Sequence, residues 1–475
     1  MRRLSTALAL VIALALLAGC SREDVLTPRS ETDGRQGGID PALLAGSIIE
    51  QSGWPIDPEE EVPVGCSGAT LIGRECIVGD IFHYIFTLRV GDGPYDVIGL
   101  HRVVREKRPY VPIRTKKAVF LQHGDGVGFV KFIYGAVAPS APDDRSFAVY
   151  LAENDVDVWG IDQDWVLVPP DETDFSFMQD WGMEHCMANL RTGLGVSRIT
   201  RLITGNGPDR LLLLGYSSGA ALGYAYLNEE AMIPERCRLV RGFIPVDMFY
   251  KTDLEGTRAQ WCVYYHEYQE WLAAGMYEYF IIFAPVGQLA RTDPDGLSPF
   301  VPGFTNMQVA LAFGGATFMF DPILPAWHYV AALFGDDGLP YDLQYMTKDN
   351  WLDYILLACG YEAGRFMGDY SGVICDEDDL PYDDNLAIID VPVFYVGAAG
   401  GIGAGGLYTT TLLGSTDVSS LIVSLHPPEE AVLDFGHIDI FAASNAQEVC
   451  WAPILEWIVA HSPHPSDKGH NPEKP

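Results

Sequence analysis

The pattern that points most directly to chemistry is a serine held between glycines. Residues 215–219 read Gly-Tyr-Ser-Ser-Gly, directly after the apolar run 211–214 and directly before a helix-forming stretch. Where a strand passes through a Gly-x-Ser-x-Gly turn into a helix, the serine sits on a strained turn, and the glycines remove Cβ atoms that would clash there. The sequence therefore predicts Ser217 as a nucleophile, with a purely structural Gly-Ser turn as the alternative.

A general base for this serine is expected late in the chain. Residues 431–441 place His437 on a Gly-bearing turn behind an apolar stretch, and residues 451–460 suit a closing helix. A histidine in this position can remove the proton of the serine and later deliver it to the leaving group. Of the eleven histidines, His437 has the most suitable order and flanks, so we predict it as the base.

Acyl transfer also needs two backbone N–H groups that face the oxygen on which negative charge develops. Ser218 is expected to supply one, because it follows the nucleophile at the start of its helix. The second is expected after an early strand, where residues 122–126 read Gln-His-Gly-Asp-Gly. We predict the N–H group of Asp125 there, with the carboxylate pointing away, since a negative charge beside an oxyanion would oppose the reaction.

Short apolar runs that alternate with helical stretches must position these residues. The runs at 118–121, 211–214 and 393–396 have the length and flanks of interior parallel strands. Strands are predicted at residues 80–90, 95–103, 117–122, 155–161, 210–214, 242–246, 391–397 and 430–435, and helices at 183–204 and 220–227. Strands that alternate with helices predict an α/β fold with a mostly parallel sheet.

One long interval breaks this alternation. It carries aromatic, helix-like segments at residues 261–283, 307–320 and 351–367. We interpret residues 250–390 as a mainly helical cap over the strand ends, where open α/β sheets bind ligands; structural decoration is the alternative. The core then comprises residues 42–249 and 391–462, followed by a polar tail at 463–475.

Four segments resemble the acid-lipase and gastric-lipase branch of the α/β hydrolases. They are residues 121–124, 150–160, 215–219 and 436–439, which match a His-Gly turn, a strand ending in Trp-Gly, the serine turn and the histidine turn. The similarity extends from about residue 111 to residue 460 and leaves out most of the cap. It implies the α/β-hydrolase fold, ester hydrolysis and a lipid-like acyl substrate. No cofactor is expected.

The resemblance also exposes a gap in the expected triad. Members of that branch carry the acid a few residues beyond the strand corresponding to residues 391–397, but residues 397–406 contain only glycine, alanine and isoleucine. Asp417 is the next acid before His437 and keeps the order Ser, Asp, His, so it is the preferred candidate. Asp247, directly after the apolar run 242–246, is the alternative.

The N-terminus has the layout of an export signal. Residues 1–20 contain two arginines, a short apolar core and Leu-Ala-Gly-Cys, which resembles a bacterial lipobox with Cys20 as the lipid-bearing residue. The polar residues 21–41 would be a flexible tether. Ser21, and not an aspartate, follows the cysteine, so the resemblance to lipoproteins of Gram-negative bacteria implies an exported protein anchored in the outer membrane; an ordinary secretory signal is the alternative.

The charge and the cysteine content indicate which classes of partner and which covalent links to expect. The net charge of −34 argues against nucleic acid and anionic headgroups as partners. The chain has no CxxC or His-x-x-x-His cluster, so no metal site is predicted. Eight cysteines remain besides Cys20, which permits disulfides outside the cytoplasm. Cys66 with Cys76, and Cys359 with Cys375, would close the shortest loops.

Together these patterns predict a serine hydrolase that cleaves a small-molecule carboxylic ester through an acyl-enzyme. Two other functions stay open on the same fold. The missing acid after residue 397 would suit a catalytically inactive surface binding protein. A peptidase or an acyltransferase would use the same serine. The sequence leaves the oligomeric state open.

Overall fold

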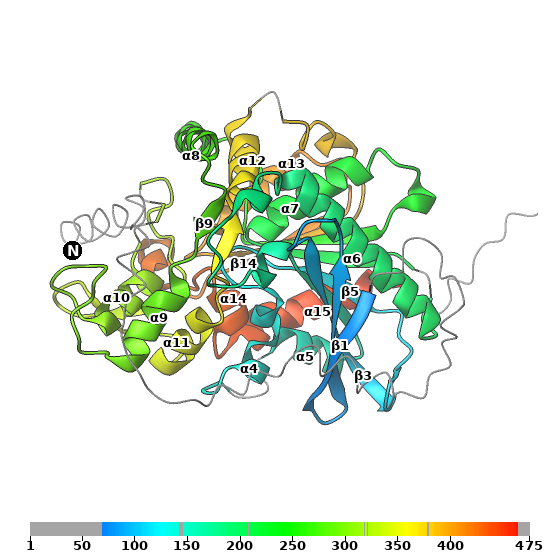
Figure 1. Ribbon diagram of the computed structural model, residues 1–475, viewed down its shortest axis with the longest axis horizontal. Helices are drawn as coiled ribbons and strands as arrows, with labels where there is room; N and C mark the ends of the chain where they lie inside the picture. The colour runs from blue at the N-terminus through cyan, green and yellow to red at the C-terminus, as the bar shows by residue number, and fades with distance from the viewer. Residues whose placement is uncertain are drawn as a thin grey trace, which may run out of the picture.

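The computed structural model describes residues 69–141, 146–207, 209–317, 319–320, 322–377 and 380–463. The predicted export signal and tether, with Cys20, lie outside these residues, as does the tail beyond residue 463. A central sheet with helices on both sides dominates the described part (Figure 1). None of the described helices has both the length and the apolar character needed to cross a bilayer.

The sheet has ten strands in the order β1-β2-β3-β6-β5-β7-β8-β13-β14, with β4 paired to β3. The first three strands pair antiparallel, and the six from β6 to β14 run parallel. The bounds are β1 (Ala69–Val78), β2 (Ile81–Arg89), β3 (Val97–Arg108), β4 (Val111–Pro112), β5 (Ala118–Gln122), β6 (Asp157–Asp162), β7 (Leu211–Tyr216), β8 (Val240–Val246), β13 (Val393–Ala398) and β14 (Val418–Val423). The mostly parallel sheet confirms the predicted α/β class.

Helices pack on both faces of this sheet. On one face lie α6 (Met183–Ile203) and α7 (Ser218–Glu230), and on the other lie α5 (Phe147–Glu153) and α15 (Ala452–Ala460). Shorter helices are α4 (Tyr134–Val137), α13 (Leu407–Thr411) and α14 (Asp439–Ala442). The predicted helices at 183–204 and 220–227 are therefore confirmed as α6 and α7.

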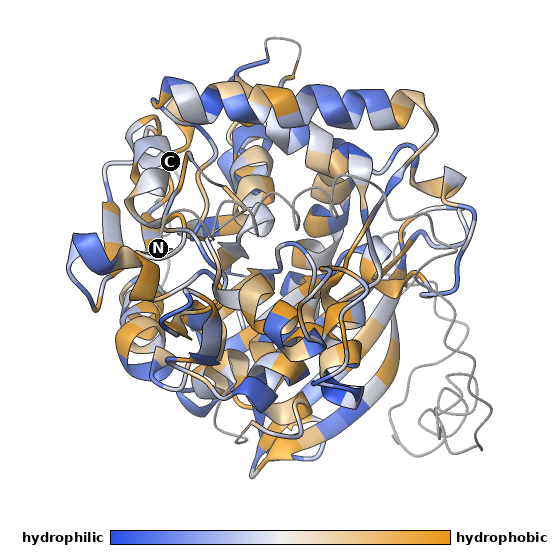
Figure 2. Cartoon of the chain, turned by 90° about the vertical axis from the view of Figure 1, so that its left-hand side faces the viewer, coloured by the Kyte–Doolittle hydropathy of each residue, from blue (hydrophilic) through white to orange (hydrophobic). Residues whose placement is uncertain are grey.

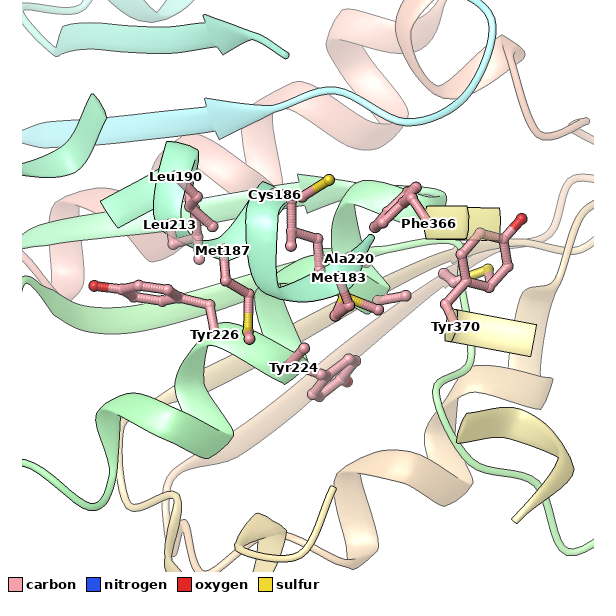
Figure 3. Packing of buried hydrophobic residues seen from close by; sticks show 14 of the residues in the cluster. Met183, Cys186, Met187, Leu190, Leu213, Ala220, Tyr224, Tyr226, Phe366 and Tyr370 are labelled. Atoms are coloured by element: carbon pink, nitrogen blue, oxygen red, sulfur yellow. The ribbon is translucent and has the colours of Figure 1, made fainter. Parts of the chain in front are cut away.

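Alternate residues of the interior strands point to the two faces. In β7, Leu211 and Leu213 join the cluster beneath α6 and α7, whereas Leu212 and Leu214 join the cluster on the opposite face. Figure 3 shows Leu213 among the side chains of α6 and α7. Because both faces are covered, these strands are continuous apolar runs, as the sequence predicted.

A large, mainly helical insertion, here called the cap, separates β8 from β13 in the chain. Its elements are α8 (Glu255–Ala273), β9 (Glu278–Phe280), α9 (Phe283–Thr292), α10 (Asn306–Gly315), β10 (Ala332–Phe334), β11 (Pro340–Leu343), α11 (Lys348–Leu356), β12 (Tyr361–Ala363) and α12 (Gly364–Cys375). In Figure 2, α8 lies across the top of the molecule. Much of the cap packs around an apolar cluster that also includes Val127 and Ile438 from outside it.

Three predicted elements differ from the structure. The predicted strand at 430–435 is a 3-10 helix (Pro428–Leu433), and the last parallel strand is β14. β14 is an edge strand with mostly exposed residues, so it lacks the apolar run used to find the other strands. The predicted helical segment at 261–283 ends earlier than expected. Its helix, α8, stops at Ala273, before Gly275, whose φ of +81° favours glycine. The predicted helix at 351–367 is two helices separated by β12.

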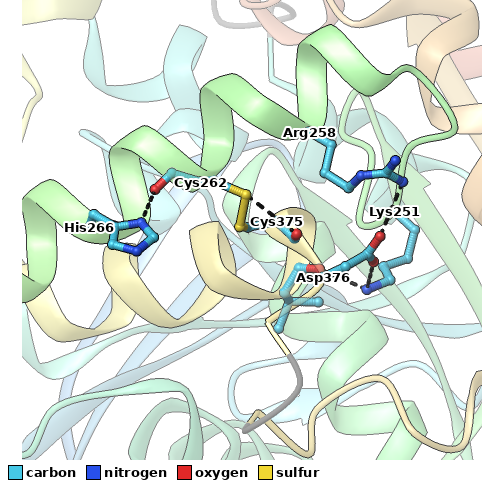
Figure 4. Close-up of a disulfide and its surroundings, with 7 residues drawn as sticks. Lys251, Arg258, Cys262, His266, Cys375 and Asp376 are labelled. Carbon is cyan, nitrogen blue, oxygen red and sulfur yellow. Dashed lines mark hydrogen bonds and ion pairs between the residues drawn. A yellow bond between two sulfur atoms is a disulfide. The ribbon is translucent and has the colours of Figure 1, made fainter.

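A disulfide joins two cap helices. Cys262 of α8 is bonded to Cys375 at the end of α12, with their Cα atoms 4.7 Å apart (Figure 4). The short loop between Cys359 and Cys375, one of the pairings that the sequence left open, is not closed: Cys375 bonds to Cys262, 113 residues away, and Cys359 is a free thiol. Cys76 has no disulfide partner among the described residues, and Cys66 lies outside them.

Candidate active site

Ser217 lies at the turn between β7 and α7. Its φ of 56° and ψ of −132° lie outside the regions that residues with a side chain normally occupy. The turn is held by hydrogen bonds from Ser217 N–H to the Val246 carbonyl, 2.9 Å, and from Ala220 N–H to the Ser217 carbonyl, 2.7 Å. The structure therefore gives Ser217 the strained strand-to-helix turn that the sequence predicted.

Three positions in and beside this turn require glycine. A Cβ atom on Gly215 would lie 2.3 Å from the Gly219 carbonyl oxygen, and one on Gly219 would lie 2.2 Å from the His123 carbonyl oxygen. A Cβ atom on Gly124 would lie 2.5 Å from the Ser217 Cβ. Such distances are shorter than van der Waals contact, so the loop after β5 and the serine turn can approach only through glycine.

His437 lies on the turn before α14. Its Nδ1 atom is 2.6 Å from an oxygen of Asp247, which follows β8. The imidazole stacks on Tyr216 with ring centres 4.7 Å apart, and the Tyr216 hydroxyl donates a hydrogen bond to the His437 carbonyl, 3.0 Å. The carboxylate and the stacked Tyr216 ring therefore fix the orientation of the imidazole. Because Nδ1 is bonded to Asp247, Nε2 is the ring nitrogen that is left to exchange a proton.

Asp247 is held by the glycine-rich loop that contains no acid. Its carboxylate accepts hydrogen bonds from the N–H groups of Ala398, 2.8 Å, Gly403, 3.0 Å, and Ile402, 3.2 Å. A Cβ atom on Gly401 would lie 2.1 Å from the same carboxylate. The loop therefore binds the acid through backbone N–H groups instead of providing it.

Asp417, the preferred acid in the sequence analysis, lies elsewhere. It directly precedes β14, which runs parallel to β13 with Val418 beside Val393, so it lies at the amino end of the strands. Asp247 lies at the carboxyl end. The Asp417 carboxylate is mostly exposed and its oxygen is 3.2 Å from His461. The preference for Asp417 over Asp247 is therefore corrected, because the unrecognised strand β14 carries Asp417 to the opposite edge.

The two residues predicted to supply the oxyanion donors, Ser218 and Asp125, lie close to Ser217 and to each other. The Ser218 N–H group is in the first turn of α7, where helical N–H groups have no acceptor within the helix. Asp125 follows Gly124, which is packed against Ser217. The Asp125 carboxylate accepts hydrogen bonds from the Ser218 hydroxyl and, at 3.5 Å, from the Tyr370 hydroxyl. Its side chain is therefore engaged beside the cavity and does not point away as expected.

A cavity of about 280 Å³ joins these residues to the cap. Ser217 and His437 lie on its core side. Residues 261, 264, 268 and 271 form one face of α8 and line the cavity from the cap side, at the spacing of a single helical face. The aromatic lining residues are Tyr216, Trp261, Tyr264, Tyr268, Trp271, Tyr279, Phe280, Phe283, Phe313, Phe320, Trp327, Tyr329, Tyr354 and Tyr370.

Two charged residues of this cavity were not predicted from the sequence. Lys131 and Glu362 line it although each is only 1% exposed to solvent. Burial raises the pKa of the Glu362 carboxyl well above its usual range and lowers the pKa of Lys131 to about 8. Burial likewise raises the pKa of Asp125. No sequence signal marks Glu362, because it lies in a three-residue strand of the cap.

Among the described residues, no group of three or more histidine, cysteine or acidic side chains could hold a metal ion.

Comparisons with known proteins bear on the fold. No protein-family profile and no curated protein matches the sequence. A candidate lipase from Sulfolobus solfataricus matches 82% of this chain and 99% of its own, with a TM-score of 0.56 and 19% identity. A monoglyceride lipase from Saccharomyces cerevisiae matches 86% of this chain and 99% of its own, with a TM-score of 0.42 and 12% identity. The likeness to the Sulfolobus protein, with the sheet order above, identifies the α/β-hydrolase fold.

Proposed function

We propose that this protein is a serine hydrolase that cleaves carboxylic esters through the triad Ser217, His437 and Asp247. The observation that carries the proposal is the 2.6 Å hydrogen bond between His437 and Asp247, on a cavity that Ser217 also lines. A serine in a strained turn beside an oriented imidazole is the arrangement that nucleophilic catalysis requires. The lipase neighbours support an ester as the substrate by analogy of fold.

In the first half of the proposed reaction, His437 Nε2 takes the proton of the Ser217 hydroxyl while Oγ attacks the ester carbonyl carbon. The imidazolium that forms is stabilised by the Asp247 carboxylate at Nδ1. Asp247 accepts three backbone hydrogen bonds besides the one from His437, so it is held in place and does not have to reorient as charge develops.

The tetrahedral intermediate places a negative oxygen between the N–H groups of Ser218 and Asp125. His437 then gives its proton to the alcohol oxygen, the carbon–oxygen bond of the ester breaks, and the acyl group remains on Ser217. Water attacks this acyl-enzyme with His437 again as the base, which releases the acid and restores the serine. Each proton that leaves one group is taken up by another, so the proposed steps balance.

The cavity favours an apolar or aromatic portion on the ester. Fourteen of its lining residues are aromatic, and such side chains contribute large buried contact areas. This lining supports the lipid-like acyl substrate suggested by the lipase resemblance, although membership of the acid-lipase branch stays a proposal.

Labelling with a fluorophosphonate probe and hydrolysis of p-nitrophenyl esters of increasing chain length test the proposal. We expect the wild-type protein to be labelled and to hydrolyse the esters, and the folded Ser217→Ala variant to do neither. An unlabelled, inactive wild type would favour a binding protein. Cleavage of peptides but not of esters would favour a peptidase, and acyl transfer to an added alcohol in excess of hydrolysis would favour an acyltransferase.

We further propose that the chain is exported and anchored through Cys20 to the outer membrane. The support is the lipobox-like sequence at residues 17–20. Replacing Cys20 by serine should move the protein from the membrane fraction to the soluble fraction, because the polar tether has little membrane affinity of its own. A Cys20→Ser variant that stays firmly membrane-bound would contradict the anchor.

A further inference from the structure

Three charged side chains meet on the cavity wall next to the nucleophile. Asp125 follows the loop that packs on Ser217, Lys131 lies in the 3-10 helix Phe129–Ile133, and Glu362 comes from β12 of the cap. Lys131 and Glu362 are almost fully withdrawn from solvent, yet both face the cavity. The triad chemistry proposed above uses none of these three side chains.

The hydrogen bonds of this cluster are incomplete. Glu362 Oε1 accepts from the Gly126 N–H group at 2.6 Å, whereas Oε2 is buried without a hydrogen-bond partner among the described residues. A buried carboxyl oxygen without a partner is destabilising, because it has lost its hydrogen bonds to water without replacing them. A group that lines a ligand cavity and retains such an unused acceptor is suited to receive a donor from a ligand.

The charges of the cluster are also unbalanced. Two carboxyl groups face one ammonium, that of Lys131, which lies 4.5 Å from the centre of the Tyr216 ring. If all three were ionised, the cluster would carry one uncompensated negative charge in a largely apolar cavity, which is costly. In the absence of another cation a proton supplies the balance, in agreement with the raised pKa of Asp125 and Glu362.

The surroundings favour a positive ligand. Tyr268, Tyr279 and Tyr370 line the cavity and interact electrostatically with both Asp125 and Glu362, and aromatic faces attract cations. A further carboxylate, Glu267, lines the same cavity from α8. The net charge of −34 raises the local concentration of cations around the whole molecule.

We propose that Asp125 and Glu362 form a recognition subsite for a protonated amine carried by the ester substrate. The inference rests on the proposed ester hydrolysis and names the class of ester. The ammonium donates an N–H hydrogen bond to Glu362 Oε2, neutralises the excess negative charge and contacts the tyrosine faces. A neutral hydroxyl group could form the hydrogen bond but would leave the charge unbalanced, so the cation is the better match.

The test uses two pairs of esters that differ only in an ammonium group replaced by a methyl group. The first pair is p-nitrophenyl 6-aminohexanoate and p-nitrophenyl heptanoate, which places the ammonium on the acyl side. The second is 6-aminohexyl butanoate and heptyl butanoate, which places it on the alcohol side. We expect kcat/KM, corrected for the rate with hydroxide, to be at least about 10-fold higher for the ammonium member of one pair.

Glu362→Gln removes the charge but keeps an oxygen that can accept from Gly126. In this variant the preference for the ammonium ester should fall about 10-fold or more. The control is Glu270→Gln on the exposed side of α8, which changes the net charge equally and should retain the preference. No ammonium preference of the wild type in either pair, or a preference that survives Glu362→Gln, would overturn the subsite.

A binding measurement keeps the inference testable if the variant does not fold or if no ester is cleaved. Tryptophan fluorescence of the wild-type protein, which has Trp261, Trp271 and Trp327 on the cavity, is titrated with hexylammonium chloride and with 1-hexanol. Tighter binding of hexylammonium by about 10-fold or more supports the subsite; equal or weaker binding overturns it. If the wild-type protein binds hexylammonium but hydrolyses none of the esters, the proposed function is contradicted and the subsite is not.

Discussion

Two buried carboxylates support the two sides of the cavity, the core wall with Ser217 and His437 and the cap wall with Glu362, and their hydrogen bonding differs. Asp247 lies behind His437 of the core wall, is fully buried and accepts four hydrogen bonds, one of them from His437. Glu362 on the cap wall is 1% exposed and accepts one. A fully satisfied carboxylate is a fixed part of the site, whereas a partly satisfied one has capacity left for a ligand.

The two walls also differ in how they are built. The core wall takes its groups from the ends of parallel strands, where Ser217 and Asp247 both have positive φ angles held by neighbouring glycines. The cap wall takes its groups from helix faces and a three-residue strand, fixed by side-chain packing and one disulfide. Backbone geometry therefore fixes the residues of the proposed triad, whereas side-chain packing fixes the cap wall.

The largest effect is expected from Ser217→Ala. Loss of the attacking oxygen should lower kcat for p-nitrophenyl ester hydrolysis by a factor on the order of 10⁴ to 10⁶. The fold should be retained, because the side chain contributes little packing. The matched control is Ser420→Ala on the exposed edge strand β14, which should keep wild-type kcat. If a folded Ser217→Ala variant kept substantial esterase activity, the core wall would not supply the nucleophile.

Asp247→Asn should have the next largest effect. Without a carboxylate at Nδ1, His437 is no longer held in the required tautomer, and kcat should fall on the order of 10⁴-fold with little change in KM. Asp417→Asn is the matched control, since its carboxylate pairs with His461 at the surface. It should leave kcat within about 2-fold. Steady-state kinetics in which Asp417→Asn has the larger effect would reverse the assignment.

Ser217 and His437 could be predicted because each has a local signal in the sequence. Strand, Gly-x-Ser-x-Gly and helix mark Ser217, and a late Gly-His turn marks His437. Asp247 was the exception, because the lipase resemblance predicts an acidic side chain after residue 397, where the structure instead has backbone N–H groups that bind Asp247. A glycine-rich loop without an acid is itself a signal that the loop binds a carboxylate from the neighbouring strand.

The cap wall was not predictable beyond its helical, aromatic character. The disulfide joins Cys262 to Cys375 across 113 residues, so the length of the closed loop does not identify the partner of Cys375. Glu362 comes near Asp125 only because β12 pairs with β9 and lies against the loop after β5. Such contacts depend on tertiary packing, and no periodicity in one sequence encodes them.

Removing the disulfide tests how far the cap wall depends on it. The double variant Cys262→Ser with Cys375→Ser should lower the free energy of unfolding by about 2 to 4 kcal/mol, because the unfolded chain regains freedom over a long loop. Since Ser217, His437 and Asp247 lie on core elements, kcat/KM should fall by less than about 10-fold. Cys237→Ser, which removes an exposed free thiol, is the control for denaturant titrations. An unchanged unfolding curve would show that α8 is held by packing alone.

The smallest expected effect concerns Asp439, which ties the turn bearing His437 to the cap. One of its oxygens accepts from the N–H groups of Gly436 and Ala331, both at 2.8 Å, and the other is buried without a partner among the described residues. Burial raises the pKa of Asp439 to about 7. The folded protein therefore keeps a proton that the unfolded chain releases above about pH 4. The contribution of Asp439 to the free energy of unfolding is therefore fully present below about pH 4 and is lost as the pH rises to about 7.

Asp439→Asn isolates this contribution, because asparagine keeps one oxygen as the acceptor and cannot ionise. Relative to the wild type, the variant should gain about 1 to 3 kcal/mol of unfolding free energy between pH 5 and pH 8, since each pKa unit corresponds to about 1.4 kcal/mol. Denaturant titrations at the two pH values measure the difference. Asp336→Asn, at an exposed carboxylate of the cap, should show no such change. If the gap between variant and wild type is the same at both pH values, Asp439 is ionised throughout, and the turn bearing His437 accommodates a second buried carboxylate as readily as it does Asp247.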